Sequence, residues 1–285
     1  MGKARTFLEV FASALNEDFR FPALEIIVSI HTVGIFIILW VSTGSGPGAQ
    51  PGLVFQILQR GSPEAVKAII VSSLAGLWSF VFTSPIFGML ILKNIAYSLG
   101  NDLERGVIQN VLSYPLKRRY ILTAKLLSSV GVVYMLMLGI QIFELFILVP
   151  DTVSQNIGFV LLTFMAALSY PLLVTGLVLL LTLLFKRGSI ALFTGIGLYF
   201  SISVVMLLLI TMAGVTSSDI PLKIAAILFP GIALGSHYQY GLDPSISKLW
   251  TPSFDESLFY IGAGYALAFF VLAMGYLYFE RRLEI

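Results

Sequence analysis

The chain has 285 residues, of which 58% are hydrophobic and 11% charged, and it carries a formal net charge of +2. Its mean hydropathy of +0.94 and its repeated apolar runs of about 20 residues are typical of proteins whose helices cross a membrane. The small net charge gives no reason to expect a nucleic-acid partner, and the absence of Cys excludes disulfides, thiolate metal sites and cysteine nucleophiles. We therefore expect an all-α membrane protein in the lipid bilayer, with residues 1–285 forming one transmembrane domain.

The first expected element is an amphipathic helix over residues 1–20. Its apolar side chains recur at helical spacing, and charged and polar side chains occupy the opposite face. The apolar residues are Phe7, Val10, Phe11, Ala14 and Leu15. A helix of this kind lies in the plane of the membrane interface, or packs on a partner as a short cytosolic helix. The sequence favours the interfacial position.

Six apolar runs follow that are long enough to span the hydrocarbon core. They cover residues 23–41, 68–92, 121–149, 157–185, 189–215 and 258–279. Lys93 and Asn94 close the second run, where their side chains are expected to reach the cytoplasmic interface. The fourth and fifth runs are separated only by Lys186, Arg187 and Gly188, which predicts a tight helical hairpin with Gly188 available for the left-handed conformation at a helix end.

A shorter apolar stretch lies between the fifth and sixth runs. It reads IAAILFPGIALG over residues 224–235 and has Pro230 and Gly231 near its centre. A helix of about 12 residues is about 18 Å long, which is too short to cross a hydrocarbon core of about 30 Å. We expect a re-entrant helical hairpin over residues 220–240, made of two short helices that dip into the outer leaflet.

The distribution of Lys and Arg predicts the orientation in the membrane. Six spans place both termini on one side, and most of the 17 Lys and Arg residues lie on that side. The exceptions are Arg60, Lys67, Lys223 and Lys248. Because short cytoplasmic loops are enriched in Lys and Arg, we expect a multi-pass protein of the plasma membrane with cytoplasmic N and C termini.

The segment between the second and third spans concentrates charge. Residues 101–125 read NDLERGVIQNVLSYPLKRRYILTAK and contain three consecutive cations, Lys117–Arg119. Apolar side chains at helical spacing predict a short amphipathic helix over residues 102–114, capped by Asn101 or Asp102. A basic cluster beside a span commonly anchors lipid headgroups, but anchoring does not account for a separate amphipathic helix.

This segment resembles the cytoplasmic signature of the type-2, export-type ABC transporter permeases. The matching residues are Glu104, Gly106, Ile108, Val111, Leu112, Pro115, Arg118 and Lys125. Val107 stands where the signature has Thr, and Ala124 stands where it has Gly before the Lys. The six-span plan, the interfacial helix and the re-entrant hairpin extend the resemblance to the whole chain.

The resemblance implies that the helix over residues 102–114 is a coupling helix, which rests in a cleft of a cytosolic ABC ATPase subunit. Its coupling residues would be Glu104, Arg105, Gly106, Ile108, Val111, Leu112, Pro115 and Arg118. ATP and Mg would bind to that partner, because this chain lacks the G-x-x-x-x-G-K-[ST] loop that holds ATP phosphates. The chain is then expected to be a non-enzymatic permease subunit without cofactor or metal, paired with an identical or sister permease chain.

Three polar residues inside the expected spans are candidates for a transport path. They are Glu144, Gln141 and His31. An ionised carboxylate near mid-membrane costs about 2.5–3.5 kcal/mol, so Glu144 lines a cavity or is protonated in an inter-helix hydrogen bond. Glu144 and His31 would serve the alternative function, a proton-coupled secondary transporter or channel, whereas an intramembrane enzyme would need convergent catalytic groups. The scarcity of polar groups favours an apolar or amphiphilic substrate, and the resemblance to export-type permeases implies that this substrate is exported.

Overall fold

A computed structural model describes residues 3–19, 25, 29, 32–33, 62–75, 88, 90, 92–107, 117–148, 150–238 and 249–281. All regular structure in these ranges is helical, which confirms the all-α prediction. Four helices in the described part are long and apolar enough to cross a membrane. Most of the expected span over residues 23–41 and much of the one over 68–92 lie outside the described residues, so the number of six spans stays a prediction.

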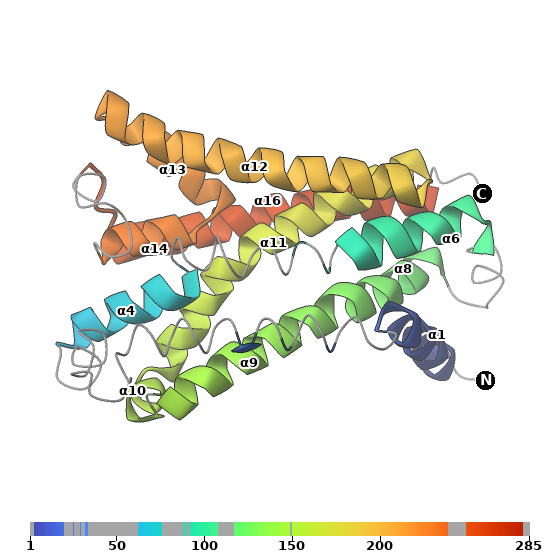
Figure 1. The fold of residues 1–285 in the computed structure, drawn as a ribbon, viewed down its shortest axis with the longest axis horizontal. Helices are drawn as coiled ribbons and strands as arrows, with labels where there is room; N and C mark the ends of the chain where they lie inside the picture. Colours follow the sequence, from blue (N-terminus) through green and yellow to red (C-terminus); the bar gives the residue numbers. More distant parts are fainter. Residues whose placement is uncertain are drawn as a thin grey trace.

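The helices of the described part follow one another in chain order (Figure 1). They are α1 Lys3–Asp18, α4 Pro63–Ala75, η2 Leu92–Leu99, α6 Gly100–Glu104, α8 Arg118–Leu126, η3 Leu127–Gly131, α9 Val132–Leu148, α10 Pro150–Gln155, α11 Ile157–Phe185, α12 Gly188–Thr216, α13 Ile220–Leu228, α14 Gly231–His237 and α16 Phe254–Arg281. The segments η2 and η3 are π-helical. Each continues directly into its neighbours, so that residues 92–104 form one unbroken helix and residues 118–148 form another.

The helix α11 runs through the centre of the bundle and packs closely against α16 (Figure 1). Their close approach depends on a small residue, because a Cβ added to Gly176 of α11 would lie 3.1 Å from the backbone nitrogen of Leu272 in α16. Small residues are typical of helix contacts in membranes, where lipid tails leave no hydrophobic driving force between helices. Tyr170 and Val174 of α11 are buried in the same core.

In contrast, α12 is held by one narrow strip of its surface. The buried residues of this strip are Gly188, Ala191, Gly195, Tyr199, Met206 and Ala213. Much of the remaining surface is apolar and exposed, with Phe193 82% and Phe200 59% exposed. A continuous surface of this composition is stable against lipid or against an apolar protein partner, but not against water.

The hairpin between α11 and α12 is built differently from the expectation. Lys186, rather than Gly188, adopts the left-handed conformation (φ 53°), and its backbone N–H donates to the Thr182 carbonyl. Gly188 instead begins α12 at a point of close contact, where an added Cβ would lie 2.3 Å from Oδ1 of Asn101. The glycine is therefore needed for packing against α6, and the lysine occupies the turn position at a cost of about 1–2 kcal/mol.

Two short helices, α13 and α14, occupy the stretch expected as a re-entrant hairpin, and the helix is interrupted between them at Phe229 and Pro230. Both pack against α16 (Figure 1). The hydroxyl of Ser257 in α16 donates to the Ala233 carbonyl of α14 at 3.3 Å. The position of the pair in the outer leaflet stays a prediction.

The last helix, α16, begins at Phe254 rather than at residue 258. The earlier start follows from a reciprocal cap: the Glu256 N–H donates to Ser253 Oγ at 3.1 Å, and the Ser253 N–H donates to Glu256 Oε2 at 3.3 Å. This capping box satisfies backbone groups that a helix start otherwise leaves without a partner. The apolar run alone marked the membrane-spanning part and missed the polar first turn.

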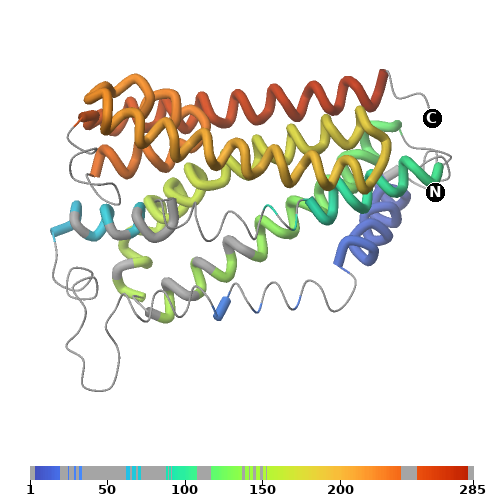
Figure 2. The backbone as a smooth tube through the Cα atoms, turned by 45° about the horizontal axis from the view of Figure 1, so that its top comes forward, coloured from blue at the N-terminus to red at the C-terminus, as the bar shows by residue number. Residues whose placement is uncertain are grey.

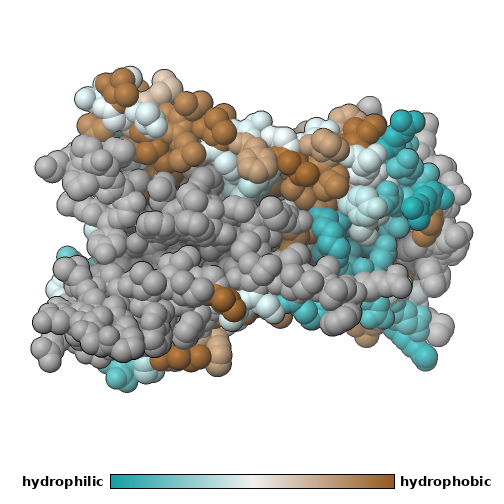
Figure 3. Space-filling view, viewed as in Figure 1, coloured by the Kyte–Doolittle hydropathy of each residue, from teal (hydrophilic) through white to brown (hydrophobic). Residues whose placement is uncertain are grey.

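The helices α1 and α6, the start of α8 and the end of α16 meet at one end of the bundle (Figures 1 and 2). Hydrophilic side chains gather at this end, whereas brown, hydrophobic side chains lie over the described parts further along the molecule (Figure 3). It is termed the charged end below. The signature residues at the ends of α6 and α8 lie there, so this end is the place to search for a functional site.

Candidate functional site

The charged end holds the two arms of the loop that carries the signature. The first arm is η2–α6, before the loop, and the second arm is α8, after it. The first arm ends at Gly106, whose φ of 70° is left-handed and whose N–H donates to the Leu103 carbonyl at 3.3 Å. A glycine takes this position at a helix end without steric strain. The expected cap at Asn101 or Asp102 is wrong, because both residues lie inside the unbroken helix.

Glu104 connects the first arm to α12. Its Oε2 accepts a hydrogen bond from the backbone N–H of Gly188, the first residue of α12, at 3.2 Å. The first N–H groups of a helix have no partner inside the helix, and the dipole makes this end attractive to a carboxylate. Glu104 therefore helps to cap α12 from the neighbouring arm.

The first arm and α12 also touch through glycines. A Cβ added to Gly100 would lie 2.6 Å from the Cα of Gly188, and a Cβ added to Gly195 would lie 2.4 Å from Leu92 Cδ2. The first arm and α12 therefore approach closely at these glycines.

We expect Gly100→Ala to destabilise the protein, because the added methyl group would meet the backbone of Gly188 rather than a movable side chain. Overpacking of this kind costs about 1–3 kcal/mol. Thermal unfolding of the purified protein in detergent measures the effect. Gly197→Ala is the matched control, since a Cβ there meets nothing within 4 Å and Ala favours a helix. Equal melting temperatures for the two variants would contradict the close contact.

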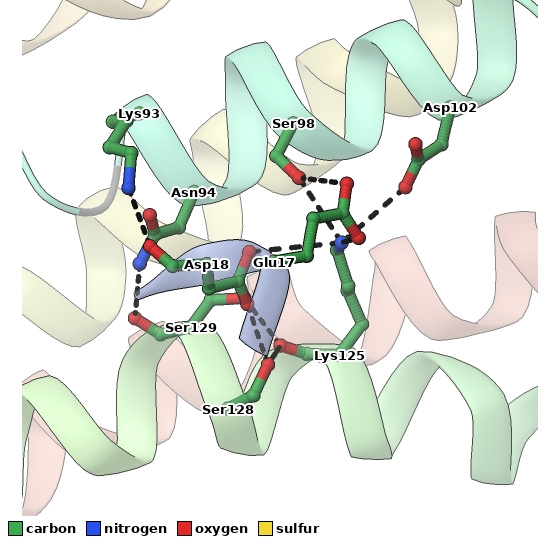
Figure 4. Close-up of polar contacts among 9 residues, drawn as sticks. All are labelled: Glu17, Asp18, Lys93, Asn94, Ser98, Asp102, Lys125, Ser128 and Ser129. Carbon is green, nitrogen blue, oxygen red and sulfur yellow. Dashed lines mark hydrogen bonds and ion pairs between the residues drawn. The ribbon is translucent and has the colours of Figure 1, made fainter. Parts of the chain in front are cut away.

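On its other side the first arm meets α1 and α8 through Lys125 (Figure 4). The Lys125 ammonium lies 2.8 Å from Glu17 Oε2, 3.4 Å from Asp102 Oδ2 and 3.7 Å from Asp18 Oδ1. It also donates to Ser98 Oγ at 3.1 Å. One cation is therefore shared among carboxylates of α1 and α6, and the side chain of Lys125 is only 12% exposed.

Asp18 is the most deeply buried member of this group, with no exposed side-chain surface. Its Oδ2 accepts hydrogen bonds from the hydroxyls of Ser128 at 2.6 Å and Ser129 at 2.9 Å (Figure 4). Burial raises the pKa of the Asp18 carboxyl above its ordinary value, and the charge of Lys125 and the two hydroxyls oppose that rise. The Asp18 carboxylate thus fixes the end of α1 to η3. Its charge is stabilised in this buried position by Lys125 and the two serine hydroxyls.

The two π-helical segments, η2 and η3, also meet at the end of α1. The side-chain amide of Asn94 in η2 donates to the Ser129 carbonyl of η3 at 3.4 Å, and the Lys93 ammonium donates to the backbone carbonyl of Asp18. Asn94 is fully buried, so the expectation that it reaches the interface is wrong, and Lys93 caps the end of α1 instead. π-helical turns are frequent at functional positions.

One known family accounts for nearly the whole chain. A family model described as ABC-2 family transporter protein matches residues 21–282. The chain belongs to this family. It is a multi-pass membrane protein and an ABC transporter permease, which confirms the resemblance seen in the loop signature. No curated protein and no solved structure matches the chain significantly.

The permease places part of its signature at the ends of the two arms. Glu104, Arg105 and Gly106 end the first arm, and Arg118 begins the second, where its side chain is exposed. Lys125, which also belongs to the signature, lies further along α8. Four signature residues lie outside the described part: Ile108, Val111, Leu112 and Pro115. Their contact with an ATPase stays a prediction, as does the coupling helix over residues 102–114.

The candidates for a transport path in the permease also stay predictions. Gln141 and Glu144 lie in α9, but their side chains are outside the described part of the structure. His31 lies outside the described residues altogether. The described geometry therefore concentrates on the charged end, where the helices that flank the loop are joined.

Sequence reasoning missed the partners of Lys125, although one signal was available. Asp18 follows Ala14 by four residues and Leu15 by three, so it continues the apolar face of α1. A carboxylate on an apolar helix face requires a buried partner, and the structure supplies Lys125. No pattern of this kind marked Ser129, whose hydroxyl lies in an otherwise ordinary apolar run.

Proposed function

We propose that this permease is driven by a separate cytosolic ABC ATPase subunit, which it contacts through the loop between the two arms, and that the charged end faces the cytoplasm. Membership of the ABC-2 transporter family supports an ATPase partner. The described part of the proposed contact consists of four residues at the ends of the arms: Glu104, Arg105, Gly106 and Arg118. ATP and Mg would bind to the partner and not to this chain.

The continuity of the arms with long helices is the observation that carries the proposal. The first arm is tied to the start of α12 by Glu104 and Gly100. The second arm continues without interruption through η3 and α9 to Leu148. A displacement of the loop by an ATPase would therefore be passed to two separate long helices of the permease.

Three exposed cations support the cytoplasmic orientation of the charged end. Lys117 precedes α8 in an extended conformation, and Arg118 and Arg119 form the first residues of that helix. Cations are unfavourable at the N-terminus of a helix, and nearby anions stabilise them there. Phosphates of the inner leaflet provide such anions. In the complete six-span arrangement, both termini would then be cytoplasmic, in the plasma membrane.

The exposed face of α12 supports a second permease chain, identical or sister, as a further partner. Its large apolar side chains, such as Phe193 and Phe200, lie outside the narrow buried strip. A path between two such faces would suit an apolar or amphiphilic substrate, which the transporter would export. Lipid would cover whatever part of the face the second chain leaves open.

Isolation of the intact permease from membranes in a mild detergent tests this function. We expect an ATPase with a G-x-x-x-x-G-K-[ST] loop to co-purify, together with Mg-dependent ATP hydrolysis. A permease that purifies without any ATPase, and that alone carries a flux driven by a pH gradient in vesicles, would contradict the proposal. That result would favour the proton-coupled alternative with Glu144 and His31.

A further inference from the structure

The side chain of Lys125 is the point at which the two arms of the loop meet (Figure 4). Lys125 belongs to the second arm, and its ammonium donates to Ser98 Oγ at 3.1 Å and to Asp102 Oδ2 at 3.4 Å, both in the first arm. The remaining donor goes to Glu17 Oε2 of α1 at 2.8 Å. An ammonium group has three N–H donors, so these contacts use its full donor capacity.

Besides this contact, Asn94 of the first arm reaches the Ser129 carbonyl of η3, and Lys93 and Ser98 reach the end of α1. The two arms nevertheless pack mainly on different neighbours. The first arm packs on α12, where Gly100 meets Gly188. The second arm packs on α1 and on α16, where the hydroxyls of Thr123 and Tyr276 lie 3.1 Å apart. The contact between Asp102 and Lys125 therefore bridges two groups of helices.

The contact is shielded from water on both sides. The Lys125 side chain is 12% exposed and the Asp102 side chain is 23% exposed, so salt screens their attraction less than that of a surface pair. Burial raises the pKa of the Asp102 carboxyl in spite of the neighbouring Lys125. A partly buried ion pair is weak evidence of stabilisation, because desolvation offsets its attraction. The Asp102–Lys125 pair lies across the base of the loop, and this position points to a role in joining the two arms.

We propose that the Asp102–Lys125 ion pair clamps the two arms together, so that a force on the loop moves both arms and α1 as one unit. Asp102 is then a positioning residue that acts through Lys125. Glu17 and Asp18 extend the clamp to α1. The inference rests on the proposed function, since the force would come from the partner ATPase.

The test uses the absence of native Cys, which leaves the permease free for two introduced spin labels. Tyr97→Cys labels the first arm and Tyr120→Cys the second, since both native side chains are exposed. Ser98→Ala/Asp102→Ala removes both contacts of Lys125 with the first arm and leaves the partners of Lys125 in α1. For the full-length permease without ATPase, pulsed electron paramagnetic resonance should give a narrow label–label distance distribution, and a broader one for the double variant.

A second measurement adds the ATPase and nucleotide. With native arms, the label separation should stay the same when ATP binds, whereas in the double variant it should change and permease-dependent ATP hydrolysis should be lost. Asp102→Glu, alone, retains the charge and should behave like the native protein. Asp219→Ala is the matched control, because it breaks an exposed Asp219–Lys223 pair of 2.6 Å at the start of α13 and should change neither result.

Equal distance distributions for the native and the doubly substituted arms would overturn the clamp, and this comparison needs no ATPase. The double variant could instead show a broader label–label distance distribution but the native response to ATP binding. That result would overturn the role of the clamp in coupling. If the double variant does not fold, Asp102→Ala alone tests the loss of the ion pair, with the Ser98 contact retained. If no ATPase binds the permease, the proposed function fails, and the measurement on the permease alone still decides whether the arms are clamped.

Discussion

Glu104→Lys is expected to lower the ATP hydrolysis of the permease–ATPase complex about tenfold while leaving the permease folded. Glu104 accepts a hydrogen bond from the first N–H of α12, and a Lys there would place a cation at the positive end of the helix dipole. Losing this partly exposed hydrogen bond and adding the repulsion amounts to about 1–2 kcal/mol. A change of that size is enough to shift α12 between two arrangements.

Mg-dependent ATP hydrolysis by the complex in proteoliposomes measures this effect. Glu104→Gln keeps an oxygen acceptor for the Gly188 N–H and should retain most of the activity. Glu280→Lys is the charge-matched control, because it makes the same change on an exposed residue at the charged end of α16. Native hydrolysis rates in the Glu104→Lys complex would show that the contact between the loop and α12 is not used.

Lys125→Met is expected to leave little folded permease. The substitution removes the cation beside Asp18, whose side chain is completely buried, and leaves the hydroxyls of Ser128 and Ser129 to hold the carboxylate. Breaking a buried ion pair on one side costs about 3–5 kcal/mol, which is a large part of the about 5–15 kcal/mol that stabilises a typical protein domain. The yield of detergent-soluble protein and its melting temperature measure the loss.

A second substitution separates the charge effect from the lost packing. Lys125→Met/Asp18→Asn should recover part of the stability, because the amide oxygen can still accept both hydroxyls without a buried charge. Arg5→Met is the control, since it breaks the exposed Arg5–Glu9 pair of 3.2 Å, and surface pairs contribute about 0–1 kcal/mol. A native melting temperature for Lys125→Met would mean that Asp18 is not ionised in the folded permease.

The helical class could be predicted from the sequence, but the position of each helix could not. Both α11 and α12 have 29 residues and a similar apolar composition, yet 61% of the most apolar part of α11 is buried in the protein and only 17% of that of α12. Hydropathy measures how favourably a side chain leaves water. Lipid and the protein interior are both favourable environments by this measure, so hydropathy does not distinguish them. Close contacts at residues such as Gly176 decide which helix is central, and no local pattern reveals its partner.

In the candidate site, the sequence identified signature residues but not their contacts within the chain. Gly106 was matched, and its left-handed backbone explains why a glycine stands there. The partner of Glu104 is Gly188, 84 positions later, and such a pairing depends on tertiary structure. The cap expected at Asn101 failed for a related reason, since η2 continues directly into α6 and a local capping preference is weaker than an existing helix.

The narrow contact strip of α12 also has a mechanical consequence. A helix of 29 residues is a rigid rod about 43 Å long, and this one is gripped near Gly100 and Glu104 at its charged end. A tilt of about 5° at the grip would swing the opposite tip by about 4 Å. Because α13 follows α12 and packs on it, that short helix would travel with the tip. In the proposed orientation, such a rod would convert a slight rotation at one membrane face into a larger displacement at the other.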